Sequence, residues 1–339
     1  MIGRVFRLMD TKRIEMKLRN IELGGDSVII KPDYLSICAA DERYYFGKRS
    51  RTALLAKLPM ALIHEAVGTV LYDAGGELEP GSKVVMIPLE TTITDSDVKS
   101  NYCKENIFAS SGADGFMRDF VALPHNRIIP IEKDYSISYA LCELLSVAVG
   151  AVAEFEKNRV TPAESFGVWG DGSMGFVTGL ALRAKYPDAN IYVFGKTGRK
   201  LNKLSFATQN FFIDQLPNDL TVNHAFECVG GRGSESAIKQ IIDIISPQGT
   251  ISLLGVNEEL VPINTRMVLE KGLRLVGNSR SDYADFAEAI KLIDKNEDIK
   301  RYLRMLISEV IEIKTEEDIP YAFEQSKLND FKTVMKWSI

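Results

Sequence analysis

The sequence predicts an α/β protein in which a doubly wound parallel sheet is inserted into a β-rich domain. Short apolar runs bounded by Gly, Pro and Asp fill roughly the first 135 residues, as in strands joined by turns. After Ser165, apolar strands alternate with helical segments, the order that a parallel sheet requires. A chain of 339 residues is long enough for two domains. We expect residues 1–148 and 281–339 to form the β-rich domain and residues 149–280 to form the parallel-sheet domain.

In the N-terminal part, the pattern predicts strands separated by polar turns. Pro80-Gly81-Ser82 is a turn that leads into one of these strands. The polar and unpatterned stretch from Pro88 to Asn106 is expected to be an exposed loop or lobe. The expected strands are Ser27 to Lys31, Ala66 to Tyr72 and Lys83 to Ile87.

A long apolar helix from Ser138 to about Lys157 separates this part from the alternating units. The tail from Asp282 to Ile339 is expected to place a helical segment on each side of a strand and to complete the N-terminal domain. The helices expected between the parallel strands include Phe176 to Lys185 and Ser234 to Ile245. The later strands are expected at Ser165 to Trp169, Ile191 to Phe194, His224 to Cys228, Thr250 to Leu254, Leu273 to Val276 and Ser308 to Ile313.

Composition and charge exclude several classes of function. The chain is 45% hydrophobic and 26% charged, and its net charge of −5 favours neither a nucleic-acid partner nor a membrane surface. The start from Met1 to Asp10 lacks the apolar core of a signal peptide, and no apolar run approaches the ~20 residues of a membrane helix. The four cysteines are far apart and form no CxxC pair, so a disulfide framework is not expected. These features indicate a cytoplasmic enzyme.

A glycine-rich turn follows the first strand of the alternating units. Its context, directly after an apolar strand and before an apolar helix, is typical of a dinucleotide site. The glycines allow a tight turn, a close approach of the pyrophosphate and close packing of helix on strand, while the helix N-terminus favours an anion. The alternative is an ordinary turn between strand and helix that binds nothing. The residues of this turn that we expect to bind cofactor are Gly170, Gly172, Ser173, Met174 and Gly175.

The residue after the second strand favours NADPH over NADH. NAD enzymes usually place an acid there to bind the ribose hydroxyls. Here Gly195 stands at that point and is followed by Lys196, Thr197, Arg199 and Lys200. A missing acid with basic residues beside it suits a 2′-phosphate; the alternative is a solvated basic loop.

A second set of residues could hold a zinc ion with one position open for substrate. Zinc prefers Cys sulfur, His nitrogen and carboxylate oxygen. The candidates are Cys38, His64 and Glu143, with Glu65 as a fourth ligand or as an exchange partner for water. Taken singly, Cys38 could be a small core residue and Glu143 an exposed helix position. Moreover, His64 and Glu65 are adjacent, so a regular strand would point them to opposite faces.

At these residues the chain resembles the zinc-dependent medium-chain dehydrogenase/reductase family, that of alcohol and sorbitol dehydrogenases. The resemblance rests on Cys38-Ala39-Ala40-Asp41, Ile63-His64-Glu65, Glu143 and the turn from Gly170 to Gly175. It implies a GroES-like β domain, an inserted Rossmann domain, catalysis at one zinc, and a homodimer. It also implies that Asp41 orients a zinc ligand and that further cofactor contacts come from Cys228, Val229, Gly255 and Val256.

Within that family the chain is similar to the ribulose-5-phosphate reductases of bacterial teichoic-acid and capsule synthesis. The segments Ser36 to Tyr45, Trp169 to Gly172, Val193 to Thr197 and Ala225 to Ser234 carry this likeness. It implies NADPH-dependent reduction of D-ribulose 5-phosphate to D-ribitol 5-phosphate, which supplies ribitol for CDP-ribitol. A ribitol-phosphate cytidylyltransferase would then be a plausible partner.

Three departures from the family pattern change what is expected of this chain. Many relatives carry four closely spaced cysteines for a structural zinc, whereas the corresponding lobe here has only Cys103, so no structural zinc is expected. Ala39 replaces a motif glycine, which is tolerable if its φ is not positive. Arg43 stands where many members have a proton-relay histidine. An arginine cannot relay a proton but can fork onto a phosphate, so we expect Arg43 and Arg280 to bind the substrate phosphate, although Arg280 could contact the cofactor instead.

Two other functions remain open at this stage. A zinc dehydrogenase could use NAD to oxidise an unphosphorylated sugar alcohol, although the missing acid at Gly195 argues against it. A catalytically silent nucleotide-binding protein could share the fold, although such proteins tend to lose metal ligands and all four candidates are present here.

Overall fold

The computed structural model describes residues 1–22, 24–91 and 97–339, which form two compact units. The first unit comprises Met1–Glu143 and Arg280–Ile339, and the second comprises Leu144–Ser279. The chain therefore leaves the first unit, builds the second, and returns. The fold class expected from the sequence, a parallel sheet inserted into a β-rich domain, is confirmed.

The first unit is built from strands that pair antiparallel, except for β17 and β18 of the C-terminal tail, which pair parallel to each other and complete the sheet. Its main sheet has the order β10-β6-β5-β3-β18-β17, with β9 also paired to β3. The main-sheet strands are β3 (Ser27–Ser36), β5 (Glu65–Asp73), β6 (Lys83–Met86), β9 (Val121–Pro124), β10 (Ile128–Pro130), β17 (Ile307–Ile313) and β18 (Lys332–Trp337). Because β18 pairs with β3, residues about 300 positions apart in sequence are neighbours in the sheet.

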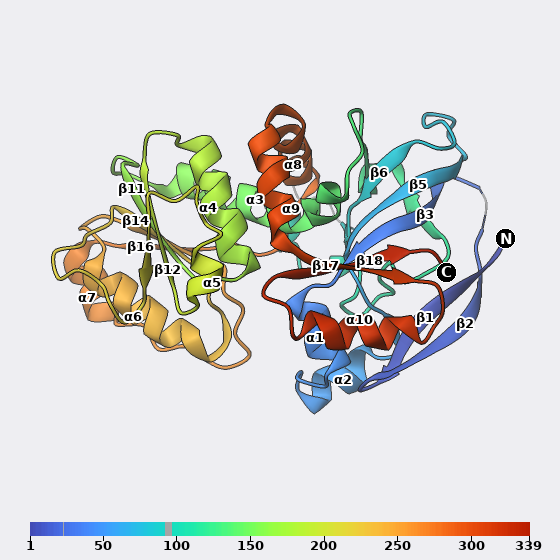
Figure 1. Ribbon diagram of the computed structural model, residues 1–339, viewed down its shortest axis with the longest axis horizontal. Coiled ribbons are helices and arrows are strands. Elements are labelled where there is room, and N and C mark those ends of the chain that lie inside the picture. Colours follow the sequence, from blue (N-terminus) through green and yellow to red (C-terminus); the bar gives the residue numbers. More distant parts are fainter. Residues whose placement is uncertain (23, 92–96) are drawn as a thin grey trace. The chain divides into compact units, whose positions relative to one another are not determined.

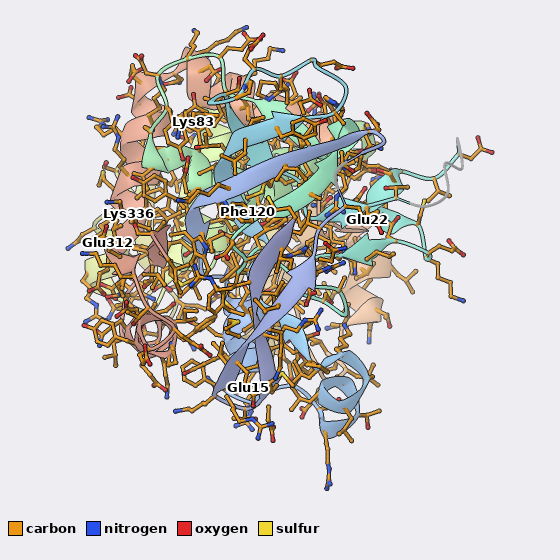
Figure 2. All side chains as sticks on the ribbon, turned by 90° about the vertical axis from the view of Figure 1, so that its right-hand side faces the viewer. Glu15, Glu22, Lys83, Phe120, Glu312 and Lys336 are labelled. Atoms are coloured by element: carbon orange, nitrogen blue, oxygen red, sulfur yellow. The ribbon has the colours of Figure 1, made fainter. Side chains whose placement is uncertain are left out.

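Smaller sheets and helices surround this main sheet. A hairpin of β1 (Ile2–Asp10) and β2 (Arg13–Asn20) joins β4 (Met60–Ala61), and β7 (Leu89–Glu90) pairs with β8 (Ile107–Phe108). Figure 2 shows the hairpin crossing the front of this unit, with Glu15 on β2. The helices are α1 (Ala39–Tyr45), α2 (Arg51–Lys57), α8 (Tyr283–Lys295), α9 (Glu297–Leu306) and α10 (Asp318–Ser326), with 3-10 turns at Ser100–Tyr102, His125–Arg127 and Ile137–Leu141.

The second unit contains a parallel sheet in the order β13-β12-β11-β14-β15-β16. The strand order reverses at β11, and α3 and α4 lie on one face of the sheet while α6 and α7 lie on the other (Figure 1). The strands are β11 (Ser165–Trp169), β12 (Asn190–Gly195), β13 (Gln209–Phe212), β14 (His224–Glu227), β15 (Thr250–Leu253) and β16 (Arg274–Gly277). The helices are α3 (Cys142–Asn158), α4 (Ser173–Lys185), α5 (Gly198–Leu201), α6 (Ser234–Ile244) and α7 (Thr265–Lys271), with a 3-10 turn at Gly231–Gly233.

The segment from Ile137 to Asn158 is the one helical stretch among the described residues that is apolar and long enough to cross a membrane. Its most apolar window is 78% buried inside the protein, as in the core helix of a globular unit. Phe155 on this helix packs edge-on against Phe166 of β11, with ring centroids 5.4 Å apart.

The structure differs from the sequence-based expectation mainly in short elements. The stretch from Pro88 to Asn106 was expected to be an exposed loop or lobe. It contains β7 and a 3-10 turn, and Leu89 and Asn101 are buried, so it is not exposed throughout; residues 92–96 lie outside the described part. The tail holds helices α8, α9 and α10 rather than two segments, because Asn296 ends α8 and caps α9.

Candidate metal and dinucleotide sites

Cys38, His64 and Glu65 converge in the first unit. Their ligand atoms all lie within 4.8 Å of one another, and His64 and Glu65 are buried. Two atoms each bound to zinc at about 2.0–2.3 Å can be at most about 4.6 Å apart, so small adjustments would bring this donor set onto one ion. The fit is supported by Glu65 Oε2, a buried oxygen without a hydrogen-bond partner among the described residues.

The local chain path explains how the three side chains meet. Cys38 caps the N-terminus of α1 directly after β3, and Glu65 is the first residue of β5. His64 lies just before that strand, after Ile63, whose φ of 71° is left-handed. Because His64 is outside the strand, the alternation of strand side chains does not separate it from Glu65.

Asp41 on α1 organises these segments through hydrogen bonds. It accepts from the backbone N–H of Cys38 at 3.2 Å and of Ile63 at 3.0 Å, and from the Ser110 hydroxyl. Its Oδ1 lies 3.3 Å from His64 Nδ1. A carboxylate on one ring nitrogen leaves the other nitrogen to a metal, as is usual for metal-binding histidines.

Electrostatics at the site are dominated by burial and by close opposite charges. Burial lowers the pKa of His64, but electrostatic and hydrogen-bond interactions with Asp41 and Cys38 outweigh it and hold that pKa well above its usual value. Burial raises the pKa of Glu143, partly offset by the positive charges of His64 and Lys332. Glu143 thus lies within electrostatic reach of the three clustered residues, although it is not one of the three whose ligand atoms fall within 4.8 Å.

Arg280 and Phe108 lie next to this cluster. The Phe108 ring centroid is 5.4 Å from that of His64, and the Arg280 guanidinium carbon is 5.1 Å from the Phe108 centroid. Arg280 is half-buried, and no carboxylate pairs with it among residues 1–22, 24–91 and 97–339. The other expected phosphate ligand, Arg43, is half-buried on α1, two residues after Asp41.

The glycine-rich turn of the second unit joins β11 to α4. Gly170 has a φ of 124°, and a Cβ on Gly175 would lie 1.9 Å from the Gly170 carbonyl oxygen, so both positions require glycine. A Cβ on Gly172 would meet nothing within 4 Å. Ser173 and Met174 open α4 at this point. The open space at Gly172, before the N-terminus of a 13-residue helix, is suited to a pyrophosphate.

The end of β12 is held by Asp171, a residue that the sequence analysis did not single out. Its Oδ2 accepts from the backbone N–H of Lys196 at 2.8 Å and of Thr197 at 2.7 Å. A Cβ on Gly195 would lie 2.6 Å from Asp171 Cβ, so no side chain fits at Gly195 beside it. This packing explains why β12 does not end in an acid.

The remaining expected cofactor residues lie around the same strand ends. Lys196 lines a hollow of about 710 Å³ with residues of β13 and α6, and Lys200 is on α5. Val229 and Val256 are 36% and 50% exposed, and Glu227 accepts from the backbone N–H groups of Val229 and Gly255, which fixes both loops. The Cys228 thiol instead donates to Thr178 on α4, so its side chain faces the helix.

Comparison with known proteins identifies both units. The family model for the alcohol dehydrogenase GroES-like domain matches residues 24–133, and the model for zinc-binding dehydrogenases matches residues 211–295. Ribulose-5-phosphate reductase 1 of Staphylococcus aureus is 48% identical over 99% of both chains, and ribulose-5-phosphate reductase of Streptococcus pneumoniae is 40% identical over 100% of this chain and 98% of its own.

Solved structures give the same result. S. aureus TarJ in complex with NADPH is 44% identical over 100% of both chains, with a TM-score of 0.89. L-Idonate 5-dehydrogenase of Escherichia coli is 18% identical, with a TM-score of 0.86, and shows the fold alone.

Proposed function

The chain belongs to the zinc-binding dehydrogenase family, and on that premise we propose that it reduces D-ribulose 5-phosphate to D-ribitol 5-phosphate with NADPH. The observation that carries this proposal is the full-length likeness, at 40–48% identity, to proteins named ribulose-5-phosphate reductases. The donor set of Cys38, His64 and Glu65 supports a zinc enzyme. When bound, zinc supplies a Lewis acid that polarises a carbonyl, and NADPH supplies the hydride.

In this proposal Cys38, His64 and Glu143 hold the metal, with Glu65 as a fourth ligand or as an exchange partner for water. Asp41 accepts from His64 and thereby fixes its ring orientation, while its bonds to the Cys38 and Ile63 backbone keep the neighbouring segments in place. Binding by three of these side chains leaves a position for the substrate oxygen.

The cofactor is assigned to the glycine-rich turn and the strand ends beside it. Gly170, Gly172 and Gly175 leave room for the pyrophosphate at the start of α4. The N–H groups of Lys196 and Thr197 are occupied by Asp171, so the 2′-phosphate would be bound by the side chains of Lys196, Thr197 and Lys200.

Arg280 is the strongest candidate for the substrate phosphate, with Arg43 as a second. Arg280 is half-buried, its guanidinium lies over the Phe108 ring, and that ring contacts His64. Arginine binds phosphate through two parallel N–H donors, and the absence of a carboxylate partner in the described part of the chain leaves those donors to a ligand.

We propose that the protein is a soluble cytoplasmic homodimer whose product supplies CDP-ribitol for a cell-wall polymer. A ribitol-phosphate cytidylyltransferase is the partner that the chemistry of the product suggests, because that enzyme would consume ribitol 5-phosphate. These assignments rest on the resemblance to the reductase family and not on a contact in the structure.

The test is NADPH oxidation with D-ribulose 5-phosphate, before and after treatment with a chelator. Ribulose serves as the unphosphorylated control, and NADH replaces NADPH in a parallel series. We expect rapid, chelator-sensitive turnover of the phosphorylated sugar with NADPH alone. Turnover of ribulose with NADH would instead assign the protein to the dehydrogenases of unphosphorylated polyols. Zinc binding without turnover of either sugar would show that the substrate is a different one.

A further inference from the structure

Lys332, the first residue of β18, is a buried cation beside the candidate metal site. It is 5% exposed, and its ammonium donates to Oε1 of Glu65, which is fully buried. The two residues are 267 positions apart in sequence and meet because the C-terminal strand enters the N-terminal sheet. A buried charge is costly unless it is paired, so this contact compensates both groups.

The two oxygens of Glu65 have different surroundings. Oε1 accepts from Lys332, whereas Oε2 is buried and has no hydrogen-bond partner among the described residues. A Glu65 carboxylate oxygen lies within 4.8 Å of both the Cys38 sulfur and a His64 ring nitrogen. The carboxylate is therefore held on one oxygen by the chain itself, and its second oxygen is left for a further ligand.

Lys332 also holds the segment that carries Cys38. Its ammonium donates to the carbonyl oxygen of Ile37 at 3.1 Å, and the Ile37 N–H donates to the carbonyl oxygen of Thr333 at 3.0 Å. The start of β18 therefore binds both polar backbone groups of the residue that precedes Cys38. One side chain thus fixes Glu65 and the approach to Cys38 at the same time.

We propose that Lys332 is a positioning residue: its ammonium donates a hydrogen bond to Oε1 of Glu65, so that only Oε2 is available to bind a metal ion. This inference rests on the metal site of the proposed function. Because the ammonium repels a divalent cation, it weakens metal binding relative to a site without it. Because it occupies Oε1, it also prevents Glu65 from binding the metal through both oxygens, which keeps a coordination position for substrate.

The test compares the zinc affinity of the wild type with that of Lys332→Met, measured by competition with a chromophoric chelator. In the variant both oxygens of Glu65 are free and its charge is uncompensated, so we expect the zinc dissociation constant to fall at least about tenfold. For the same reason, the substitution should lower the melting temperature of the metal-stripped protein more than that of the zinc-loaded protein, each compared with the wild type in the same metal state. Turnover should fall despite tighter zinc binding.

Lys336→Met is the matched control. Lys336 lies on the same strand and pairs with Glu312 at 3.0 Å, but both side chains are largely exposed, and Figure 2 shows them together on the surface. Loss of this pair should leave the zinc dissociation constant unchanged, because exposed ion pairs contribute little. Lys332→Arg keeps the positive charge and should bind zinc as the wild type does.

The outcomes separate this inference from the proposed function. If the wild type binds no zinc, the metal site itself is wrong and the role of Lys332 falls with it. Suppose that the wild type binds zinc, that Lys332→Met binds it equally well, and that the substitution lowers the melting temperature equally with and without zinc. Lys332 then forms only a structural ion pair with Glu65, and this inference alone is overturned. If the metal-stripped variant does not fold, the rate at which a chelator removes zinc is measured on the folded, zinc-loaded variant instead. We expect slower removal than from the wild type, and equally fast removal overturns the inference.

Discussion

Three non-glycine residues with positive φ lie in or beside the candidate metal site. They are Ile63 at 71°, Ser110 at 62° and Arg280 at 59°. Such conformations cost roughly 1–3 kcal/mol each and persist only where the surroundings enforce them. Here the enforcing contacts are visible for two of them, because Asp41 accepts from the Ile63 N–H and from the Ser110 hydroxyl. The strain is thus tied to the residue that also orients His64.

Ala39 and Ile63, which lie in the two zinc-ligand motifs, differ in backbone conformation. Ala39 lies in the first turn of α1 and is not among the residues with positive φ, so replacing a glycine there is tolerated. Ile63 has a left-handed conformation that is rare for a β-branched residue, and its side chain is fully buried. The burial of Ile63 stabilises the fold by an amount comparable to its backbone strain, about 1.5–3 kcal/mol.

Arg280 is the residue whose substitution tests phosphate recognition. If its guanidinium binds the substrate phosphate, Arg280→Gln should raise the KM for D-ribulose 5-phosphate by about 10- to 100-fold, because a hydrogen bond to a charged group contributes ~1.5–3 kcal/mol. Steady-state kinetics at saturating NADPH measures this. Arg301→Gln is the control, since Arg301 also lies over an aromatic ring, 5.0 Å from Tyr302, but is exposed and paired with Asp298. A rise in the KM for NADPH instead would assign Arg280 to the cofactor.

At the scale of elements, the glycine-rich turn and the β12–α5 turn form one linked structure. Asp171 in the first turn accepts from two backbone N–H groups of the second, and its side chain fills the space above Gly195. A change in either turn therefore affects the other. NAD enzymes place a carboxylate at the end of the second strand. Here the carboxylate at that point is Asp171 of the preceding turn, and it accepts hydrogen bonds from the backbone.

This linkage predicts different effects for two neighbouring substitutions. Lys196→Ala should raise the KM for NADPH by about tenfold and leave that for NADH nearly unchanged, because only NADPH carries the 2′-phosphate. Asp171→Ala should raise both, because it releases the Lys196–Thr197 backbone. Titrating each variant with both cofactors measures the difference. Equal effects of Lys196→Ala on the two cofactors would reject a role in 2′-phosphate binding.

At the scale of the whole chain, His224 couples stability to pH. It is fully buried on β14, where its ring packs against Phe155 and Phe166. Its Nδ1 accepts from the Thr250 N–H at 3.1 Å, which leaves Nε2 to donate to the Pro162 carbonyl oxygen at 3.1 Å. Both ring nitrogens are thus satisfied by the neutral ring, and burial lowers the pKa of His224.

The sign of the pH effect follows from that lowered pKa. Below about pH 6.5 the unfolded chain binds a proton at this histidine that the folded chain does not, so stability falls as the pH falls. We expect the melting temperature to drop between pH 7 and pH 5, and the drop to be smaller in His224→Gln. Glutamine can accept from Thr250 and donate to Pro162 but does not titrate in this range. An identical pH dependence of the two proteins would show that other groups control it.

Local patterns in the sequence were sufficient for much of the fold and for the choice of site residues. The strand Ser165–Trp169 begins and ends where the apolar run does, because a strand in a parallel sheet is buried on both faces. The glycines of the turn after it are fixed by local sterics at Gly170 and Gly175. Cys38, His64 and Glu65 could be selected because few residue types bind zinc and these stand beside strand ends.

Other features depend on residues that are distant in sequence, and only the tertiary structure decided them. The hairpin β1–β2 and the short strands carry weak patterns because much of β2 is exposed. Asp171 was overlooked because its partners are 25 and 26 residues away. The burial of Lys332 against Glu65 follows only from the pairing of β18 with β3. The local sequence does not show whether a charged side chain is solvated or buried, because the pairing of distant strands determines which residue lies next to it. The sequence by itself therefore determined the fold class, the family resemblance and the candidate ligands, and the tertiary structure determined which side chains orient them.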